Sequence, residues 1–496
     1  MKNVYSVEEM RRFDRETIRG GVSSEKLMFN AGVALREAHP FDGKTAIVCG
    51  KGNNAGDGYV LAALLKREGK DCRLFLAEDA FSPDGRNYYK DCAALGVPSE
   101  RITEETDLSP YNTVVDCLFG TGFKGEPHGV YKTAIEAINR SGAYVVSVDI
   151  NSGLNGDNGL GTTVVQSDLT VALGGYKSGL FLNQSKDFIR ALVSVPIGIH
   201  AENTNLFVSE DTDFIDFLLP RKNFSHKGGY GYVGVFGGST SYAGALKLSY
   251  LSLAALRGGC GVSTVVAEEE TAKAVAPIVL ESTVLSLQRG EEKEILRPWL
   301  RKWKALSVGM GWGTDVSREN YLRFLLDEYE GYLILDADAL NVSAKYGISL
   351  KGRKCTVIVT PHLGEMARLT GLSVSEIRSD PIRHARAFAE ENGCITVLKG
   401  TATVVSDGKK TVLSTRGAAG MATAGSGDVL SGILTGVFGQ NPSDPLSAAV
   451  YGVYLNGLSG EIAQNEVGDI SMTSADTVRC IPSAIRYLRK QCGINA

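Results

Sequence analysis

The sequence predicts an α/β protein of two domains, each built around a mainly parallel β-sheet. Short runs of apolar, often β-branched residues alternate with helical stretches from about residue 44, and this alternation restarts after about residue 229. The runs lack the polar alternation of a half-exposed strand, as expected when helices cover both faces of a parallel sheet. Glycine-rich turns follow many of these runs, so we expect ligand sites at the strand ends.

The first domain is assigned to residues 1–208, with one or two helices expected in residues 5–38 before its first strand. Helical stretches, among them GYVLAALLKREG and YKTAIEAINRSG, separate the first four strands. The strands expected in this domain are TAIVCG (45–50), CRLFLA (72–77), TVVDCLFG (113–120), YVVSVDI (144–150), LTVALGG (169–175) and ALVSVPIG (191–198).

The second domain is assigned to residues 230–496, after a linker of mixed polarity at residues 209–229. A hairpin, TATVVSDGKKTVLS, is expected to turn at Asp407-Gly408, a favoured two-residue turn. The strands expected before it are YGYVGVFGG (230–238), GVSTVVA (261–267), ALSVGMG (305–311), YLILDAD (332–338), CTVIVTP (355–361) and CITVLKG (394–400).

Composition indicates an ordinary globular protein, with 43% hydrophobic and 22% charged residues and a net charge of −4. No run of like charges favours nucleic acid or a membrane surface, and no apolar run reaches the ~20 residues of a membrane span. Nine cysteines stand singly, without a CxxC pair, which favours reduced thiols. We expect a cytoplasmic homo-oligomer that acts on small molecules.

The stretch IVCGKGNNAGDGYVLAALL (47–65) leads from a strand through a polar, glycine-rich loop into a helix. Its glycines follow the spacing G-x-G-x-x-x-G, one residue longer than the dinucleotide fingerprint, and the Walker sequence is absent. Asp57, near the start of the helix, is a plausible cap. A capped connection without a ligand is the alternative.

Two further strand ends carry polar groups that should share one crevice with this loop. Asp116 lies inside an apolar strand, and Asp149 ends the next one. Buried carboxylates are rarely left unpaired, so a cation among Asn54, Asp116 and Ser152 would account for Asp116. A carboxylate that caps a helix or pairs with a lysine is the alternative.

A second glycine-rich turn, GAAGMATAGSGDVLSG, places Gly425, Gly427 and Asp428 at the start of a helix. Free backbone amides at a helix start suit a phosphate, and Asp428 could accept a proton from a substrate hydroxyl during phosphoryl transfer. A glycine-rich helix start with no ligand is equally open from this turn alone.

The surrounding loops favour the functional interpretation of this second turn. They carry Lys399 in VLKGTATVV, His362 and Glu365 in VTPHLGEMARL, and Asp336 and Asp338 in LILDADALN. The segments VGMGWGTD and FGGSTSYAGALKLS add two more glycine-rich loops. A histidine beside a proline is more often structural, so the set of loops is the stronger indication.

The segments GKGNNAGDG, VVDCLFGTGFKGE and SVDINSGLNGD together resemble the site segments of NAD(P)HX epimerase domains, which are isomerases with a Rossmann-like α/β/α sandwich. The resemblance spans most of residues 1–208, and Ala55 departs from the family's NNGGD by one methyl group. It implies a potassium ion on Asn54, Asp116 and Ser152. It also implies substrate contacts at Asn53, Asn54, Ala55, Gly56, Asp57, Gly120, Thr121, Gly122, Phe123, Lys124, Gly125, Glu126 and Asp149.

Epimerisation of a carbon that bears a hydroxyl beside a ring nitrogen requires proton transfer through a ring-opened or dehydrated intermediate. We expect Asp149 to be the acid/base, with Lys124 lending positive charge.

Residues 221–490 resemble the ADP-dependent NAD(P)HX dehydratases, lyases of the ribokinase-like superfamily, and Gly425 to Asp428 match that superfamily's G-x-G-D turn. The resemblance implies that ADP or ATP phosphorylates the ring hydroxyl and that phosphate then leaves, with Mg²⁺ expected beside the nucleotide. Leu363 and Ala402 replace a usual proline and glycine. The implied contacts are Ala245, Gly311, Gly313, His362 and catalytic Asp428 for the hydrated cofactor, and Lys399, Gly400, Thr401, Ala402, Thr403 and Gly427 for the nucleotide.

The two resemblances support each other, because a dehydratase that accepts one epimer needs the other epimer converted. The chain is therefore expected to repair hydrated nicotinamide cofactors. A vitamin kinase in the second half, or a non-catalytic binding module in the first, is the alternative.

Overall fold

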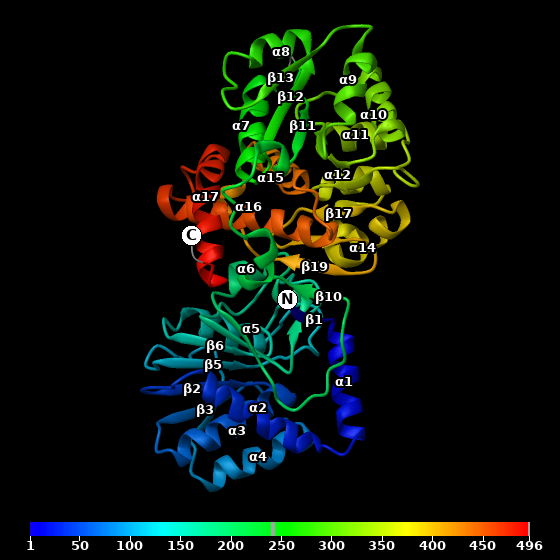
Figure 1. The fold of residues 1–496 in the computed structure, drawn as a ribbon. Coiled ribbons are helices and arrows are strands. Elements are labelled where there is room, and N and C mark those ends of the chain that lie inside the picture. The colour runs from blue at the N-terminus through cyan, green and yellow to red at the C-terminus, as the bar shows by residue number, and fades with distance from the viewer. Residues whose placement is uncertain (240–243, 495–496) are drawn as a thin grey trace. The chain divides into compact units, whose positions relative to one another are not determined.

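The computed structural model describes residues 1–239 and 244–494, and the chain forms two compact units (Figure 1). Residues 3–204 make up the N-terminal unit, while residues 1–2 and the chain from residue 205 onward make up the C-terminal unit. All nine cysteines are free thiols. None of the helices among the described residues has the length and apolarity that a membrane span requires.

The N-terminal unit contains a seven-stranded parallel sheet in the order β4-β3-β2-β5-β6-β7-β9. The strand order reverses at β2, which lies between β3 and β5, so the loops after β2 and β5 diverge and leave a crevice. The strands are β2 (Thr45–Cys49), β3 (Cys72–Leu76), β4 (Ser99–Arg101), β5 (Thr113–Cys117), β6 (Tyr144–Val148), β7 (Leu169–Leu173) and β9 (Leu192–Val195).

Helices cover both faces of this sheet (Figure 1). Ile47 and Cys49 of β2 pack with α2 (Ser24–Ala38) and α3 (Asn53–Arg67) on one face, beside α4 (Pro83–Ala94). Ala46 and Val48 alternate with them and pack with α5 (Val130–Arg140) on the other face. Burial on both faces explains why the strand sequences are apolar without alternation.

A strand at the N-terminus and the strand that it pairs with were not expected from the sequence. A short strand, β1 (Lys2–Tyr5), precedes the helices and pairs in parallel with β8 (Tyr176–Lys177). The helix α1 (Val7–Arg19) follows it, with Ser6 and Glu9 forming a capping box at its start. Strands of two to four residues carry too little periodicity to be predicted.

The C-terminal sheet runs in the order β13-β12-β11-β14-β15-β16-β17-β18-β19-β10, with β18 antiparallel to both of its neighbours. Its order reverses at β11, between β12 and β14. The strands are β10 (Leu206–Val208), β11 (Tyr232–Phe236), β12 (Val262–Glu268), β13 (Thr283–Leu287), β14 (Ala305–Val308), β15 (Tyr332–Leu335), β16 (Thr356–Val359), β17 (Ile395–Leu398), β18 (Thr403–Ser406) and β19 (Thr411–Ser414).

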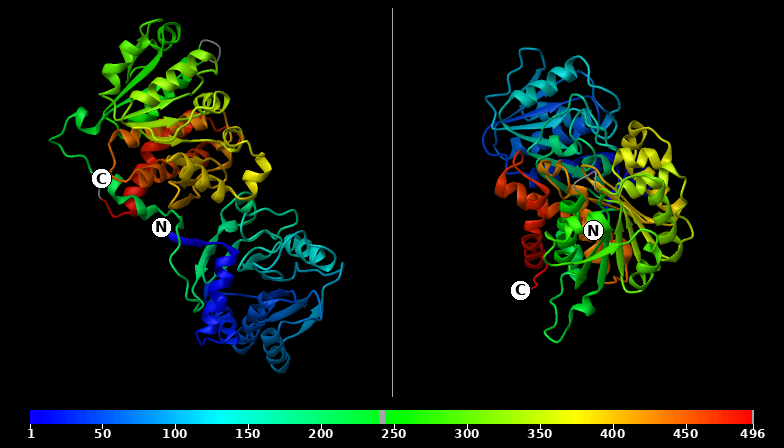
Figure 2. Two further views of the ribbon diagram at one scale, coloured as in Figure 1. Left: turned by 90° about the vertical axis from the view of Figure 1, so that its right-hand side faces the viewer. Right: turned by 90° about the horizontal axis from the view of Figure 1, so that it is seen from above.

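The helices of this unit also lie on both faces of the sheet, with the orange and red helices on one side and the yellow-green and yellow helices on the other (Figure 2). The first group is α15, α16 and α17, which share one apolar core with the strands. The helices are α7 (Gly244–Arg257), α8 (Glu269–Val275), α9 (Glu292–Leu300), α10 (Val316–Glu328), α11 (Asp338–Lys345), α12 (Leu363–Thr370), α13 (Val374–Ser379), α14 (Pro381–Asn392), α15 (Ser426–Gly439), α16 (Pro445–Val467) and α17 (Ser474–Gln491).

The segment expected to link the domains packs into the C-terminal unit. β10 pairs in parallel with β19, so the units divide at residue 205, ahead of the boundary placed after residue 208. Phe214 and Leu218 then bury their side chains in the core against α16 and α17. Mixed polarity along residues 209–229 concealed these two anchors.

The hairpin turn differs by one residue from the prediction. The Asp407 amide donates to the Lys410 carbonyl at 3.3 Å, which places Gly408 and Lys409 at the tip. Gly408 has a φ of 90°, and the Asp407 carboxylate accepts from the Lys409 and Lys410 amides. These side-chain bonds favour the shifted turn.

We predict that Gly153→Ala destabilises the N-terminal unit by about 3 kcal/mol or more. Gly153 has a φ of +94°, and an added Cβ would stand 1.9 Å from the Thr163 carbonyl oxygen. Gly69→Ala is the matched control, because its φ of +76° carries strain but no atom lies within 4 Å of the new Cβ. That variant should cost only about 1–2 kcal/mol. Equal losses in denaturant unfolding would contradict the packing argument.

Candidate active sites

The first glycine-rich loop ends in the helix α3, which begins at Asn53 after the N-cap residue Gly52. An added Cβ on Gly50 would stand 2.2 Å from the Leu118 carbonyl oxygen, so glycine lets this loop approach the loop after β5. Asp57 does not cap the helix as expected, because it is buried within α3. The N-cap position is Gly52, which has no side chain to accept a capping bond. Ala55 is also helical and has no positive φ, so its extra methyl group adds no backbone strain.

Asp116 is fully buried in β5, and hydroxyl and amide groups surround its carboxylate. Ser147 Oγ donates to it at 2.9 Å, Ser152 Oγ at 2.6 Å, and the amides of Leu118 and Ser152 at 3.2 and 2.9 Å. Burial raises the pKa of Asp116, and these four hydrogen bonds oppose that rise. The carboxylate is therefore held by dipoles, neither capping a helix nor pairing with a lysine.

Asn54 meets Asp116 and Ser152 around the Phe119 backbone. Asn54 Nδ2 donates to the carbonyl oxygens of Phe119 at 2.8 Å and Val148 at 3.2 Å, and the Phe119 amide donates to Ser152 Oγ at 2.9 Å. Asn54 Oδ1 is buried and accepts no hydrogen bond. A buried oxygen without a donor is costly unless a cation or water supplies a partner. The three residues expected to bind metal thus lie together.

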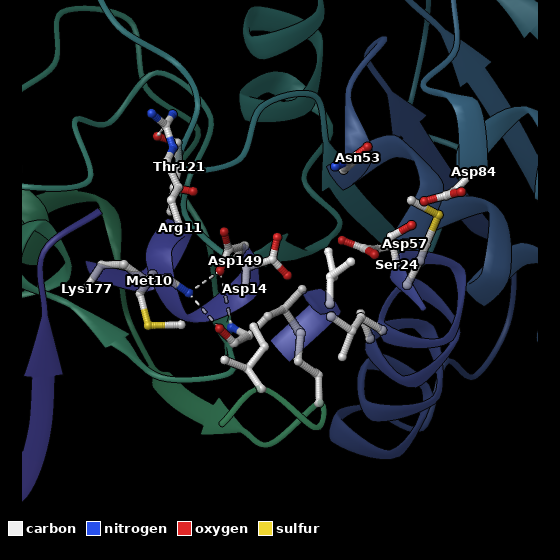
Figure 3. A pocket seen from close by; sticks show the side chains of 17 residues that line it. Met10, Arg11, Asp14, Ser24, Asn53, Asp57, Asp84, Thr121, Asp149 and Lys177 are labelled. Atoms are coloured by element: carbon white, nitrogen blue, oxygen red, sulfur yellow. Dashed lines mark hydrogen bonds and ion pairs between the residues drawn. The ribbon is translucent and has the colours of Figure 1, made fainter. Parts of the chain in front are cut away.

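Three carboxyl groups are shared by the linings of two adjoining chambers, one of about 730 Å³ and a smaller one of about 210 Å³; Asp84 lines only the smaller and Glu126 only the larger. Asp14, Asp57 and Asp149 border both chambers, and Figure 3 shows Asp14 beside Asp149 with Asp57 opposite. Burial, followed by the charges of Asp149 and Asp14, raises the pKa of Asp57 well above its usual range. Burial also raises the pKa of Asp14. Neighbouring carboxyls with different proton affinities can act as acid and base.

The lysine that pairs with Asp149 is Lys177, whereas the sequence suggested Lys124. Lys177 is buried and forms an ion pair with the Asp149 carboxylate. Lys124 is exposed and borders neither chamber. The tertiary structure brings Lys177 to the site from β8, and nothing in the sequence GGYKSG marks this lysine for such a role.

Most of the expected substrate-contact residues border the larger chamber. Four are not among its lining residues: Ala55 and Gly56, which are buried in α3, and Lys124 and Gly125. Arg11 and Asp14 of α1 line it but were missed, because a charged helix face usually indicates only solvent exposure. The expected residues that do line it are Asn53, Asn54, Asp57, Gly120, Thr121, Gly122, Phe123, Glu126 and Asp149.

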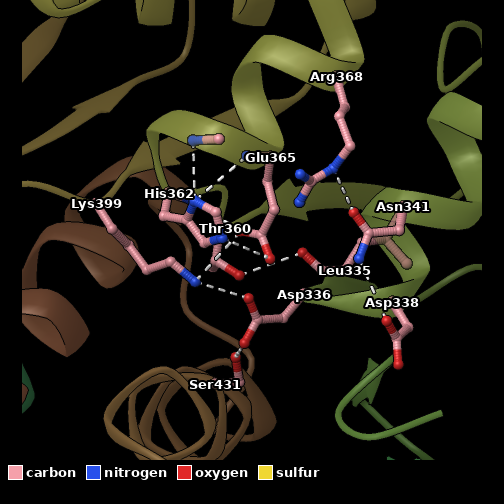
Figure 4. A network of polar contacts seen from close by, with 11 residues as sticks. Leu335, Asp336, Asp338, Asn341, Thr360, His362, Glu365, Arg368, Lys399 and Ser431 are labelled. Atoms are coloured by element: carbon pink, nitrogen blue, oxygen red, sulfur yellow. Dashed lines mark hydrogen bonds and ion pairs between the residues drawn. The ribbon is translucent and has the colours of Figure 1, made fainter. Parts of the chain in front are cut away.

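In the C-terminal unit, Lys399 follows β17 and points toward two buried carboxylates (Figure 4). Its Nζ donates to Asp336 Oδ1 at 2.9 Å and lies 3.7 Å from Glu365 Oε2. Burial lowers the pKa of Lys399, but the two carboxylates outweigh burial and the net pKa is raised. Burial acts against the ionised form of Asp336, but Lys399 and a 2.7 Å bond from Ser431 Oγ hold its pKa below the usual range.

His362 is the N-cap of α12, so it has a structural role beside any contact with substrate. Its Nδ1 accepts from the amides of Gly364 at 2.9 Å and Glu365 at 3.3 Å, while Glu365 Oε2 accepts from the His362 amide at 2.8 Å. Burial lowers its pKa, and the neutral ring must then carry its proton on Nε2. Leu363 begins the helix, at a position where the family's proline would also fit.

The second glycine-rich turn opens α15 beside Lys399. Gly425 has a φ of +91° at the N-cap, and an added Cβ on Gly427 would stand 3.4 Å from Lys399 Nζ. Asp428 lies in the first helical turn, and its charge contributes to the raised pKa of Lys399. Backbone amides of a helix start, an ammonium group and a carboxylate therefore meet here.

The remaining expected residues occupy neighbouring loops. Gly311 and Gly313 have positive φ values of 61° and 84° after β14, and the Gly313 amide donates to Asp338 Oδ2 at 2.7 Å. Gly400, Thr401 and Ala402 lie between β17 and β18, with Ala402 buried, and Thr403 begins β18. Ala245 falls in α7, in the part of that helix whose side chains lie outside the description.

Two family models cover the two halves of the chain. Residues 24–179 match the YjeF-related protein N-terminus, and residues 233–483 match NAD(P)H-hydrate dehydratase. A bifunctional NAD(P)H-hydrate repair enzyme of Thermofilum pendens is 35% identical over 98% of this chain and 97% of its own. The chain belongs to the family of bifunctional NAD(P)H-hydrate repair enzymes.

Further comparisons agree with this family assignment. The repair enzyme of Escherichia coli is 31% identical, over 95% of this chain and 92% of its own. The ADP/ATP-dependent NAD(P)H-hydrate dehydratase of Bacillus subtilis, co-crystallised with ATP/Mg²⁺, matches with a TM-score of 0.51 and 25% identity. That match covers 58% of this chain and all of the other. The predicted union of an epimerase with a ribokinase-like dehydratase is confirmed, and a vitamin kinase fused to a binding module is not favoured.

We predict that Asp57→Asn makes this NAD(P)H-hydrate repair enzyme more stable at pH 7. The pKa of Asp57 is higher in the folded state than in the unfolded chain, where it is near 4. The protonated carboxyl therefore contributes its full stabilisation below about pH 4. That contribution is lost as the pH rises toward the folded-state pKa. The amide has no such loss, and the gain should be about 1.4 kcal/mol for each unit of pKa difference.

The check is denaturant unfolding of the wild type and Asp57→Asn at pH 7 and near pH 4. The difference should vanish at the lower pH, and exposed Asp91→Asn on α4 serves as the control. A gain that persists unchanged at the lower pH would contradict the assignment.

Proposed function

We propose that the cavity beside α1 and α3 is the epimerase site, with Asp149 as the acid/base. The observation that supports this most is that Asp149, Asp57 and Asp14 all line this cavity, with Asp57 opposite the other two. Asp149 would take the proton of the ring hydroxyl as the adjacent C–N bond opens to an aldehyde. Asp57, the buried carboxyl, would protonate the nitrogen. Rotation and closure on the opposite face would invert the carbon and return both protons.

We propose a potassium ion on Asn54, Asp116 and Ser152, directly behind this cavity. The unpartnered Asn54 Oδ1, a buried carboxylate and a serine hydroxyl are the hard oxygen donors that such a cation prefers. Bound there, the ion would tie the loops after β5 and β6 to the start of α3. It would also add positive charge behind the reacting ring.

In the C-terminal unit, we propose that Asp428 is the base for phosphoryl transfer. It would accept the proton of the ring hydroxyl as that oxygen attacks the terminal phosphorus of ADP or ATP, releasing AMP or ADP. The C–O bond would then break, phosphate leaving with its electron pair, and loss of a proton from the neighbouring carbon would restore the dihydronicotinamide. Phosphate leaves far better than hydroxide, which is why a kinase-like fold suits a dehydration.

The remaining groups would bind the two substrates. Lys399 would neutralise the charge of the nucleotide phosphates, and the backbone amide of Gly427 would donate a hydrogen bond to them. The Nε2–H of His362 would donate to the hydrated cofactor. We propose that Mg²⁺ would bind together with the nucleotide phosphates, because this ion usually needs only one or two protein carboxylates. Asp336 and Glu365 would offer suitable oxygen ligands.

Crossed variants test the assignment of one reaction to each unit. Asp149→Asn should slow R/S exchange of NAD(P)HX by about 10²–10⁴-fold and leave nucleotide-driven recovery of NAD(P)H from the S epimer unchanged. Asp428→Ala should do the reverse, by a similar factor. Exchange is followed by chromatography of the epimers, and recovery by near-ultraviolet absorbance. Undiminished recovery in Asp428→Ala would refute the proposal for the C-terminal unit.

Potassium binding is tested by stability, independently of activity. At about 100 times its dissociation constant, K⁺ should add about 2.7 kcal/mol to the unfolding free energy of the N-terminal unit, and Li⁺ should add little. The increment should disappear in Asn54→Ala, measured within that variant so that its own loss of stability cancels. An equal increment in the variant would exclude Asn54 as a ligand.

A further inference from the structure

Lys177 is a buried lysine that none of the epimerase site segments contains. Its side chain is 2% exposed, whereas lysines are almost never buried unless they are paired. It ends β8, and the pairing of Tyr5 with Lys177 across β1 and β8 fixes its backbone. Its Nζ donates to the Leu173 carbonyl at 2.7 Å and to the Asp149 carboxylate (Figure 3). Two elements absent from the sequence prediction therefore place this ammonium group.

The partner carboxylate stands on an unusual backbone. Asp149 has a φ of +68°, in the left-handed region that non-glycine residues seldom adopt. Its amide donates to the Val171 carbonyl at 2.8 Å, and the Leu173 amide donates to Asp149 Oδ1 at 3.3 Å. Such a conformation persists only where surrounding contacts hold it, and it is frequent at active sites. The end of β7 and Lys177 together provide those contacts.

The distribution of charge around the cavity gives this lysine a specific task. Asp14, Asp57, Asp84 and Asp149 all line the smaller chamber, and Lys177 is the buried cation among its lining residues. Arg11 also lines it, but its guanidinium donates to the Thr121 carbonyl at 3.2 Å in an exposed contact. A single ammonium group balances the charge of one carboxylate. Lys177 forms its ion pair with Asp149, so the charge of Asp149 is the one balanced.

We propose that Lys177 is a positioning residue for the epimerisation. Its ammonium group pairs with the Asp149 carboxylate and keeps it aimed into the cavity, so that Asp149 can receive the hydroxyl proton. Lys177 itself neither gains nor loses an atom. The inference rests on the proposed role of Asp149 as the acid/base.

The test is Lys177→Met in the full chain, which keeps the length of the side chain and removes its charge. We expect kcat for R/S exchange to fall by about 10²–10³-fold, with KM within about twofold, since an aligning group acts on the reacting geometry more than on binding. Lys132→Met on α5 is the matched control, because that lysine is 55% exposed. Dehydratase activity of the same preparation reports on the C-terminal unit.

A second variant guards against a local loss of fold. Lys177→Arg retains the positive charge, and we expect its kcat to exceed that of Lys177→Met by at least about tenfold. Thermal unfolding of the N-terminal unit is recorded for both variants. Equal losses of kcat in the two variants, or a normal kcat in Lys177→Met, would overturn the proposal.

The double variant Lys177→Met/Asp149→Asn separates the two hypotheses. If Lys177 acts through Asp149, the double variant exchanges epimers no more slowly than Asp149→Asn alone. A further loss of the same factor would overturn the positioning role. A normal rate in Asp149→Asn would instead overturn the proposed acid/base, whereas loss in that variant with normal Lys177→Met would overturn only the inference about Lys177.

Discussion

A carboxylate buried at the end of a parallel strand must have its charge compensated where it stands, and this constraint organises both units. Burial in low dielectric disfavours the charged form by several kcal/mol unless hydrogen bonds or a counter-charge oppose it. Asp116 is held by hydroxyls and amides, Asp149 by Lys177, and Asp336 by Lys399 and Ser431. In each case the compensating group comes from another segment of the same unit. The contact therefore fixes that segment against the strand end.

The two carboxylate–lysine pairs, Asp149 with Lys177 and Asp336 with Lys399, have similar geometry but suit different chemistry. In the N-terminal unit, the buried Lys177 pairs with Asp149, whereas burial raises the pKa of Asp57 and of Asp14. In the C-terminal unit, Lys399 lies between Asp336 and Glu365 beside the start of α15. The first arrangement suits proton transfer, and the second suits an incoming polyphosphate.

Strand order explains where the N-terminal site occurs; in the C-terminal unit, Asp336, His362 and Lys399 follow the adjacent strands β15, β16 and β17. Each sheet reverses its order next to its first central strand, β2 in one unit and β11 in the other. The loops on the two sides of that reversal diverge, and the polar residues of adjacent loops then face a common crevice. The fold class thus locates each site, while the residues in the loops decide which reaction it supports.

The sequence by itself determined the class of fold, the long strands and the glycine-rich turns, and it singled out Asp116, Asp149, Asn54, Lys399 and Asp428 as candidate site residues. These features are local, because apolar runs and glycine spacing reflect the backbone nearby. Only the tertiary structure decided that Lys177 is the partner of Asp149, that Asp14 borders the cavity, that Asp57 is buried within its helix and that Phe214 anchors the supposed linker. Those facts depend on which segments, distant in the sequence, come into contact when the sheets form. Residue type and periodicity do not predict such long-range contacts.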